Sequence, residues 1–358
     1  MLLNIKTTNV RIYPIIIGSD LDSKLIKLIK QVKAEKLVII TDEHLAHNQG
    51  SKLLKQLKTT KLNVDMIVIP AGETNKTQPQ VTKLQHTLLK KHYGRDTLII
   101  ALGGGVVGDL AGFVAATYLR GVPYIQVPTT VLAMVDASVG GKVGIDTVYG
   151  KNTIGAFYQP VGVIMDMNRL RGLPHTQQVS GLIEALKTFL TSDRAAVKLI
   201  INKYKLDKII SRSVKIKSAI VMRDEHESNE RRVINFGHTI GHALEKMSKY
   251  TLPHGYAVGY GIIAECSIAQ ALGILSEKEN LAIQKILQKF GITKQIFSKY
   301  SAREIISVTH SDKKVQAGLV YYILLKKIGQ VYKVNGQYAH PVSDKVVFKV
   351  LTQLGCKP

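Results

Sequence analysis

Three histidines and one glutamate in the second half of the chain have the residue types and spacing of a metal site. His238 and His242 are four residues apart, so a helix would place both imidazoles on one face. His254 follows shortly, and Glu184 lies upstream in an otherwise apolar turn, where a carboxylate without a partner is expensive to bury. Two histidines and one carboxylate make the open, three-ligand site of a catalytic zinc.

The spacing leaves the ligand set open. It does not say which two of His238, His242 and His254 would bind a metal, and all three also fit the interpretation of ordinary polar residues on helix faces. A metalloprotease of the zincin type is disfavoured, because the glutamate that follows its first histidine is missing here.

A glycine-rich segment in the first half matches the pattern of a dinucleotide-binding turn. Residues 103–109 read Gly-Gly-Gly-Val-Val-Gly-Asp and follow a predicted strand, and residues 110–118 are predicted to be helical. Backbone N–H groups at such a helix start bind a diphosphate, whereas a turn without a ligand gives no reason for three costly glycines. Asp42 and Glu73 are candidates for the adenosine ribose, although Asp42 precedes the glycines and the usual acidic residue follows them.

Basic and amide side chains in the middle of the chain indicate an anion site. Lys142, Lys151 and Asn152 stand in glycine-containing segments after the fourth predicted strand, where we expect loops at the ligand-binding edge of a sheet. They suit a phosphate or carboxylate, although exposed loop lysines are also expected in so basic a chain. Further candidates are Lys217, Arg231, Asn235, Lys313 and Lys314.

The elements that must position these residues alternate in the first half and become helical in the second. Predicted strands at residues 36–40, 64–69, 97–102 and 124–127 alternate with helices such as 20–33 and 80–91. Helices are then predicted at 178–193, 211–223, 239–249, 254–272 and 276–289, with strand patterns returning only near 319–325. We therefore expect an α/β N-terminal dinucleotide-binding domain with a mostly parallel sheet at 1–170, and a mainly α-helical C-terminal domain at 171–358.

Composition narrows the class of partner. Among 358 residues, Lys and Arg outnumber Asp and Glu by 49 to 26, an excess that suits nucleic acid, an anionic membrane or an anionic substrate. The lysines follow helical faces without a block of like charge, so we expect no nucleic-acid partner.

The apolar stretch 257–275 contains Glu265 and is predicted to be a core helix, not a membrane span. Two isolated cysteines and no signal peptide indicate a reducing cytoplasm.

Taken together, these motifs resemble the 3-dehydroquinate synthase family. The shared segments keep the family's order over nearly the whole chain and lie at residues 103–113, 118–121, 126–130, 135–142, 150–152, 157–160, 235–242 and 312–314. The resemblance implies a catalytic NAD, a divalent metal (usually zinc, with cobalt as the alternative) and a site in the cleft between two domains. It also implies a homodimer in which Arg120 reaches the phosphate site of the neighbouring subunit.

The resemblance also implies a role for each matching residue. It assigns the metal to Glu184, His238 and His254, and leaves His242 for the substrate phosphate. The implied NAD contacts are Asp42, Glu73, Lys76, Gly104, Gly105, Val106, Asp109, Thr129, Thr130, Lys142 and Lys151. The implied substrate contacts are Asp136, Lys142, Asn152, Lys187, Lys217, Glu227, Arg231 and Asn235.

The reaction that the resemblance implies converts 3-deoxy-D-arabino-heptulosonate 7-phosphate to 3-dehydroquinate and phosphate, a step of the shikimate pathway to aromatic amino acids. The alternatives are another sugar phosphate cyclase, such as 2-deoxy-scyllo-inosose synthase, and a metal-dependent polyol dehydrogenase. Arg231 with Lys217 favours a substrate that carries a carboxylate, which the other cyclase substrates lack. A nucleic-acid-binding protein would rest on the positive charge alone.

A few positions depart from the residues that are common in the family. His44 stands where asparagine is common, Gly172 where threonine is common, and Tyr256 where glutamate is frequent. Asp146 and Thr147 replace a frequent Asn-His pair. These departures bear on the affinity for the cofactor and touch none of the three implied metal ligands.

Overall fold

The chain folds into two compact units that are built from different elements. The computed structural model describes residues 11–358 except 61, 203–204, 311–314 and 317–318. The first unit comprises the chain up to Thr129 together with Gly141–Arg169, and the second comprises Thr130–Gly140 and the chain from Leu170 onward. The predicted division into domains at residue 170 stays a prediction.

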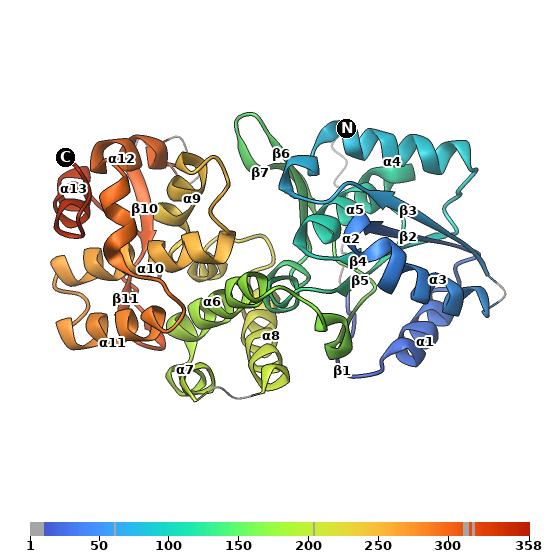
Figure 1. Cartoon of the computed structure of the whole chain (residues 1–358), viewed down its shortest axis with the longest axis horizontal. Helices are drawn as coiled ribbons and strands as arrows, with labels where there is room; N and C mark the ends of the chain where they lie inside the picture. Colours follow the sequence, from blue (N-terminus) through green and yellow to red (C-terminus); the bar gives the residue numbers. More distant parts are fainter. Residues whose placement is uncertain (1–10, 61, 203–204, 311–314, 317–318) are drawn as a thin grey trace, which may run out of the picture. The chain divides into compact units, whose positions relative to one another are not determined.

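A six-stranded parallel sheet forms the centre of the first unit (Figure 1). Its order is β1-β8-β5-β4-β2-β3, and every neighbouring pair is parallel, as the sequence predicted. The edge strand β1 and its neighbour β8 were not predicted. The strands are β1 (Ile15–Gly18), β2 (Lys36–Asp42), β3 (Asn63–Ile69), β4 (Thr97–Gly103), β5 (Tyr124–Pro128) and β8 (Gly162–Asp166).

Helices cover both faces of this sheet. Leu37 and Ile39 of β2 pack into a core with α1 and α3, whereas Val38 and Ile40 pack into a second core with α4 and α5. Successive side chains of a strand point to opposite faces, so a continuous apolar strand needs helices on both sides. The helices are α1 (Asp22–Val32), α2 (Glu43–Leu45), α3 (Ser51–Lys58), α4 (Gln78–Lys90) and α5 (Gly105–Thr117).

The order of the strands in the sheet reverses between β2 and β4. After β2 the chain forms β3 on one side of it, and then passes through α4 to form β4 on the other side of β2. Ligands of such sheets bind at this reversal, outside the carboxyl ends of the strands. Asp42 ends β2 and Gly103 ends β4, so both candidate cofactor segments reach this edge.

An antiparallel hairpin, β6 (Lys142–Thr147) and β7 (Gly150–Phe157), completes the first unit. The sequence analysis placed these residues in loops, and the structure corrects that prediction. Gly144 and Gly155 face each other across the pair, and a Cβ on them would lie 2.5 and 2.2 Å from the opposite backbone. Gly144 and Gly155 are therefore required by close strand pairing.

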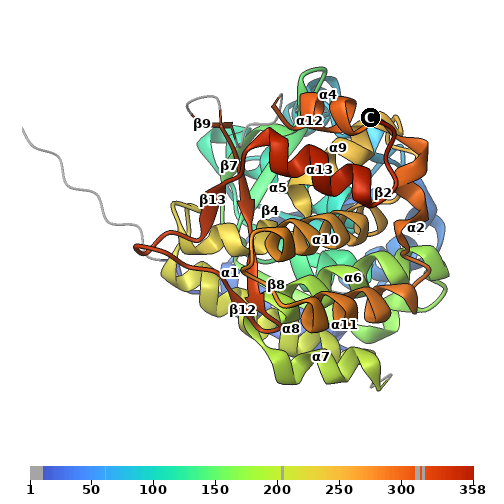
Figure 2. The same cartoon turned by 90° about the vertical axis from the view of Figure 1, so that its left-hand side faces the viewer.

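The second unit is mainly helical, as predicted, and α10 is its central helix. Figure 2 looks onto this unit, with α10 across its middle, and α10 packs against α6, α9, α11 and α13. Cys266 in α10 is fully buried, which agrees with its predicted place in the core. Within the part of the chain that the structure describes, α10 and the other helices all fall short of the length and apolar character needed to cross a bilayer.

The elements of the second unit extend beyond those that the sequence predicted, since α7, α12 and α13 were missed. The helices are α6 (His175–Ser192), α7 (Arg194–Ile201), α8 (Leu206–Arg223), α9 (His238–Met247), α10 (His254–Ala271), α11 (Glu277–Gln288), α12 (Ala302–His310) and α13 (Asp344–Gln353). The short strands are β9 (Val315–Gln316), β10 (Leu319–Ile323), β11 (Leu325–Lys327), β12 (Gln330–Val331) and β13 (Ala339–Pro341).

Candidate active site

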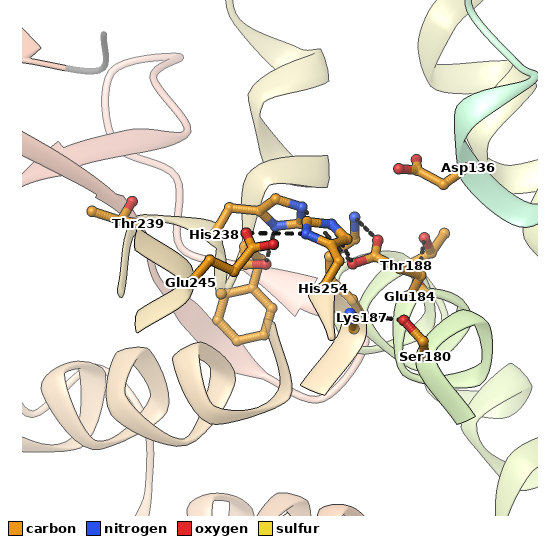
Figure 3. Close-up of polar contacts among 12 residues, drawn as sticks. Asp136, Ser180, Glu184, Lys187, Thr188, His238, Thr239, Glu245 and His254 are labelled. Carbon is orange, nitrogen blue, oxygen red and sulfur yellow. Dashed lines mark hydrogen bonds and ion pairs between the residues drawn. The ribbon is translucent and has the colours of Figure 1, made fainter. Parts of the chain in front are cut away.

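Three helices of the second unit bring the proposed metal ligands together. Glu184 lies in α6, His238 is the first residue of α9 and His254 is the first residue of α10. Their ligand atoms all lie within 4.8 Å of one another. The Nε2 atoms of His238 and His254 are 3.8 and 3.6 Å from Glu184 Oε1, and the three side chains point toward one another in Figure 3.

Glycine contacts explain why these helix ends approach so closely. A Cβ on Gly255 would lie 2.2 Å from the carbonyl oxygen of Ser180, and the Gly255 N–H donates to Ser180 Oγ at 2.8 Å. A Cβ on Gly261 would lie 1.8 Å from the carbonyl oxygen of Gly237. Only glycine therefore allows the backbone of α10 to touch both α6 and the start of α9.

The Glu184 carboxylate is held by one oxygen and leaves the other directed at the cluster. Its Oε2 accepts a hydrogen bond of 2.5 Å from Lys187 Nζ, and both side chains are almost fully buried. Among the described residues, none supplies a hydrogen bond to the buried Oε1. A buried acceptor without a donor is costly, and a bound cation would satisfy it. These residues therefore fit a metal.

The second ring nitrogen, Nδ1, of His238 and of His254 lies close to an oxygen atom of the protein. His238 Nδ1 lies 3.1 Å from the carbonyl oxygen of Phe236, and His254 Nδ1 lies 3.2 Å from Glu245 Oε2. An acceptor at Nδ1 favours the tautomer in which Nε2 has a lone pair for a metal. Glu245, which the sequence analysis did not single out, thus sets the orientation of a proposed ligand.

His242 belongs to a second group of close donors. The ligand atoms of His242, Glu245 and His254 also lie within 4.8 Å of one another, and the His242 ring centroid is 5.2 Å from that of His238. This second group would leave Glu184 Oε1 without a partner. The geometry therefore favours Glu184, His238 and His254 as the ligands, with His242 beside them.

A buried pair of opposite charges lies in the same unit. Lys217 Nζ donates to the carbonyl oxygen of Asp136 at 2.5 Å and also to its carboxylate. Burial by itself raises the pKa of the Asp136 carboxyl, but Lys217 and Lys187 together hold it well below its usual value. Burial lowers the pKa of the Lys217 ammonium, although Asp136 opposes that shift. This pair and Lys187 can bind and orient polar groups of a substrate.

Two more predicted substrate residues have structural contacts of their own. Arg231 is only 2% exposed, and its guanidinium donates to the carbonyl oxygens of Gly140, at 2.9 Å, and Glu225. Gly140 has a φ of +103°, and a Cβ there would lie 2.4 Å from the Arg231 guanidinium. Asn235 donates from its amide to the Glu227 carboxylate. Arg231 therefore anchors the segment that ends at Gly140, besides its predicted contact with substrate.

The predicted NAD contacts of the first unit lie at the carboxyl edge of its sheet. α5 begins at Gly105, five residues earlier than predicted, because the absence of a side chain at Gly103 lets Val107 pack there. Gly104 is the N-cap, and none of the described side chains caps this helix. The first-turn N–H groups suit a diphosphate. Asp42, Glu73, Lys76, Asp109 and Thr129 come from segments that end or follow β2, β3, β4 and β5.

Lys76 forms the centre of a charged cluster at this edge. It is 3% exposed, and its Nζ lies 2.6 Å from Asp109 Oδ2 and 4.0 Å from Glu73 Oε1. Burial by itself lowers the pKa of the Lys76 ammonium, but Asp109 and Glu73 raise it above its usual value. Lys151 Nζ lies 3.7 Å from the same Glu73 oxygen. The cluster thus keeps Lys76 as an ammonium group, with Lys151 nearby on the same glutamate.

The remaining predicted residues lie in varied surroundings. Asp42 caps α2 by accepting the N–H groups of His44, at 3.0 Å, and Leu45, at 3.2 Å. Arg120 is exposed at the end of the turn that follows α5, and Lys142 is exposed at the start of β6. Thr130 falls in the second unit. Lys313 and Lys314 lie outside the described residues.

Comparison with known proteins identifies the family. Residues 66–180 match the sequence profile of 3-dehydroquinate synthase N-terminal domains, and residues 180–315 match that of the C-terminal domains. The 3-dehydroquinate synthase of Desulforamulus reducens is 39% identical over 333 residues, covering 90% of this chain and 92% of the relative. The chain belongs to the 3-dehydroquinate synthase family. The predicted family, fold class and type of enzyme are confirmed.

Solved structures of related cyclases share the fold of this 3-dehydroquinate synthase family member. A 2-deoxy-scyllo-inosose synthase complexed with carbaglucose-6-phosphate, NAD+ and Co2+ has a TM-score of 0.86 at 26% identity, over 95% of this chain and 96% of that chain. The 2-epi-5-epi-valiolone synthase of Streptomyces hygroscopicus, with NAD+ and Zn2+ bound, has the same TM-score of 0.86 at 23% identity, over 98% of this chain and 99% of that chain. The second likeness shows the fold alone.

Glu265 is a site residue that sequence reasoning missed. It is fully buried in α10 and accepts the N–H groups of Gly237, Thr239 and Ile240 at 2.7, 3.1 and 3.5 Å. A carboxylate at a helix N-terminus is stabilised by the helix dipole, so Glu265 fixes the end of α9 that carries His238. The signal was present in the sequence, since a lone glutamate in an apolar helix had also singled out Glu184.

Proposed function

We propose that this chain converts 3-deoxy-D-arabino-heptulosonate 7-phosphate to 3-dehydroquinate and phosphate, with NAD as a recycled cofactor and one divalent metal. The proposal rests mainly on the cluster of Glu184, His238 and His254, in which the buried Oε1 of Glu184 would be satisfied by a cation. The chain also matches both family profiles. The related 2-deoxy-scyllo-inosose synthase, whose structure was solved with NAD+ and Co2+, supports NAD and a divalent metal as the two cofactors.

Glu184, His238 and His254 would hold the metal, either Zn2+ or Co2+. When bound, a divalent metal polarises a substrate oxygen as a Lewis acid and so favours loss of a hydride from the adjacent carbon. The chain's part is to keep three donors in place. Lys187 fixes the carboxylate and Glu245 fixes the His254 ring, so little rearrangement is needed when the metal arrives.

Residues at the carboxyl edge of the sheet would hold NAD. The uncapped start of α5 suits the diphosphate, the carboxylates of Asp42 and Glu73 suit ribose hydroxyls, and Lys76 and Lys151 add positive charge. NAD supplies a hydride acceptor that can later return the hydride. The cofactor must remain bound between these two events.

Cationic side chains would bind the two anionic ends of the substrate. We assign the carboxylate to Arg231 and Lys217 and the phosphate to His242 and Lys142, following the family resemblance. Positive charge beside the phosphate stabilises it as a leaving group, and fixed orientation lets one of its own oxygens accept the neighbouring proton. No side chain then has to be reserved as the general base. The need for a substrate carboxylate distinguishes this proposal from the other sugar phosphate cyclases.

Phosphate release across candidate heptulosonate and hexose phosphates tests the proposal. We expect rapid release from the heptulosonate, many phosphates per NAD and no accumulation of NADH in solution. Deuterium at the carbon that is oxidised should reappear at the corresponding carbon of the product. Preference for a hexose phosphate would favour 2-deoxy-scyllo-inosose synthase activity. One NADH formed per turnover would favour a polyol dehydrogenase.

A further inference from the structure

The hairpin that carries Lys151 and Asn152 is irregular at one point. Ile145 pairs with Ile154 and Thr147 pairs with Gly150, so between these pairs a single residue of β6 faces three residues of β7. The three are residues 151–153, and Asn152 has a φ of +52°. A non-glycine residue with positive φ is strained and needs surrounding contacts to hold it.

The single facing residue of β6, Asp146, supplies those contacts. Its Oδ1 accepts the backbone N–H of Asn152 at 2.8 Å, and its own N–H donates to the carbonyl oxygen of Lys76 at 2.8 Å. The Asn152 side chain in turn accepts from Lys76 Nζ, which lies 2.6 Å from Asp109 Oδ2. Asp146 therefore joins the strained residue of β7 to the buried lysine at the edge of the sheet.

We propose that Asp146 is a positioning residue for NAD binding, which acts by holding Asn152 and Lys151 against the Lys76 cluster. The proposal rests on the function proposed above, because it assumes that Lys76 and Lys151 contact NAD. Asp146 occupies a position where the family commonly has asparagine. Both side chains offer an oxygen to the Asn152 N–H, but only the carboxylate can titrate.

The charge on Asp146 depends on the groups that face it. Burial, together with the charge and hydrogen bond of Glu73, raises the pKa of Asp146 to about 6, although Lys76 and the Asn152 N–H oppose the shift. Above that pH the carboxylate makes a charge-assisted bond to the strained residue. Below it the proton engages both Asp146 and Glu73, which weakens the hold on Asn152 and occupies Glu73, a proposed ribose contact. NAD should therefore bind more weakly as the pH falls through about 6.

The raised pKa of Asp146 also affects the stability of the folded protein. The pKa of Asp146 rises from 3.8 to about 6 on folding, so the folded protein holds more protons than the unfolded chain between these values. The free energy of unfolding contributed by this group therefore falls as the pH rises through that window, and none of the fall is regained above it. Asp146→Asn removes this contribution, because an amide does not titrate.

Titration calorimetry with NAD at about pH 5 and about pH 7.5 tests the proposal. For the unmodified protein we expect the Kd to be about fivefold higher at the lower pH, the difference between a charged and a neutral hydrogen bond. Asp146→Asn should remove most of this pH dependence. Asp146→Ala should raise the Kd about tenfold at the higher pH but only about twofold at the lower, because the Asn152 N–H loses its acceptor and no carboxyl remains to titrate. Asp146→Asn should also raise the Tm relative to the unmodified protein, and by more at the higher pH.

Asp65→Asn provides the matched control in the same unit. Asp65 lies in β3, and its ion pair with Lys91 helps hold the pKa of its carboxyl below the usual value, so it does not titrate near 6. This variant should keep the unmodified pH dependence of NAD binding. The proposal is overturned if Asp146→Asn keeps that dependence too, or if Asp146→Ala binds NAD as well as the unmodified protein. If the unmodified protein does not bind NAD at all, the proposed function fails together with this inference.

Discussion

Each proposed metal ligand turns one atom to the cluster and the other to a protein partner, so removing different side chains should have different effects. We expect His254→Ala to lose the metal, because one of three ligands is gone. We expect His242→Ala to keep the metal and to turn over slowly, since His242 lies beside the cluster and is assigned to phosphate. Metal content after dialysis, measured by mass spectrometry, separates the two. Metal loss from His242→Ala with retention by His254→Ala would show that the ligand set is wrong.

A pair of glutamates supplies the control for this assignment. Glu184→Gln should abolish metal binding, whereas Glu245→Gln should weaken it by about 10–100-fold, because Glu245 only orients the His254 ring. Competition with a chelating dye measures both affinities. The reverse order of effects would move the metal to the second group, formed by His242, Glu245 and His254.

At the scale of elements, the contact between α10 and α6 decides whether the ligands meet. Gly255→Ala would place a methyl group 2.2 Å from the Ser180 carbonyl oxygen, so the start of α10 must move away from α6. We expect the free energy of unfolding to fall by about 1–3 kcal/mol, and metal affinity to fall as His254 moves away from Glu184. Thermal unfolding and metal titration measure the two effects.

Gly259→Ala, in the same helix, is the matched control for this backbone contact. A Cβ there would meet the Ile292 side chain at 3.2 Å, and a flexible side chain can shift where a backbone carbonyl cannot. We expect a small change in Tm and an unchanged affinity for metal. Equal effects of both substitutions would mean that α10 tolerates movement and that close packing at Gly255 does not position the ligand.

At the scale of the whole molecule, we propose from the family resemblance that Arg120 completes a shared site in a homodimer. Leu119 and Arg120 have φ values of 49° and 68°, and successive strained residues are usually retained for a function. We expect Arg120→Ala to be inactive with its metal intact. Mixing it with inactive Lys142→Ala should restore about a quarter of normal activity, because half of the dimers are hybrids with one intact site.

Two measurements keep this prediction separate from a defect in folding. Native mass spectrometry of differently tagged subunits must show hybrid dimers, and each parent protein must retain its normal Tm. If hybrids form and activity does not return, Arg120 acts within its own subunit. A monomer in solution would contradict the shared site altogether.

The order of elements and the chemical candidates could be predicted from the sequence because they depend on local patterns. Apolar runs such as Leu37–Ile40 need cover on both sides, which indicates a parallel sheet between helices wherever the rest of the chain folds. The glycine turn after β4 and the histidines of α9 also lie within single segments. Lone charges in apolar helices, such as Glu184, were informative because burial without a partner is expensive.

Contacts between distant segments were decided only by the tertiary structure. Spacing could not choose among His238, His242 and His254, whereas the position of Glu184 Oε1 on another helix favours His238 and His254. Likewise, the sequence showed Asp146 only as a departure from the family, and strand pairing then set it opposite Asn152. A sequence pattern reports what one segment prefers, but a ligand set and a shifted pKa depend on atoms that meet only after the chain has folded.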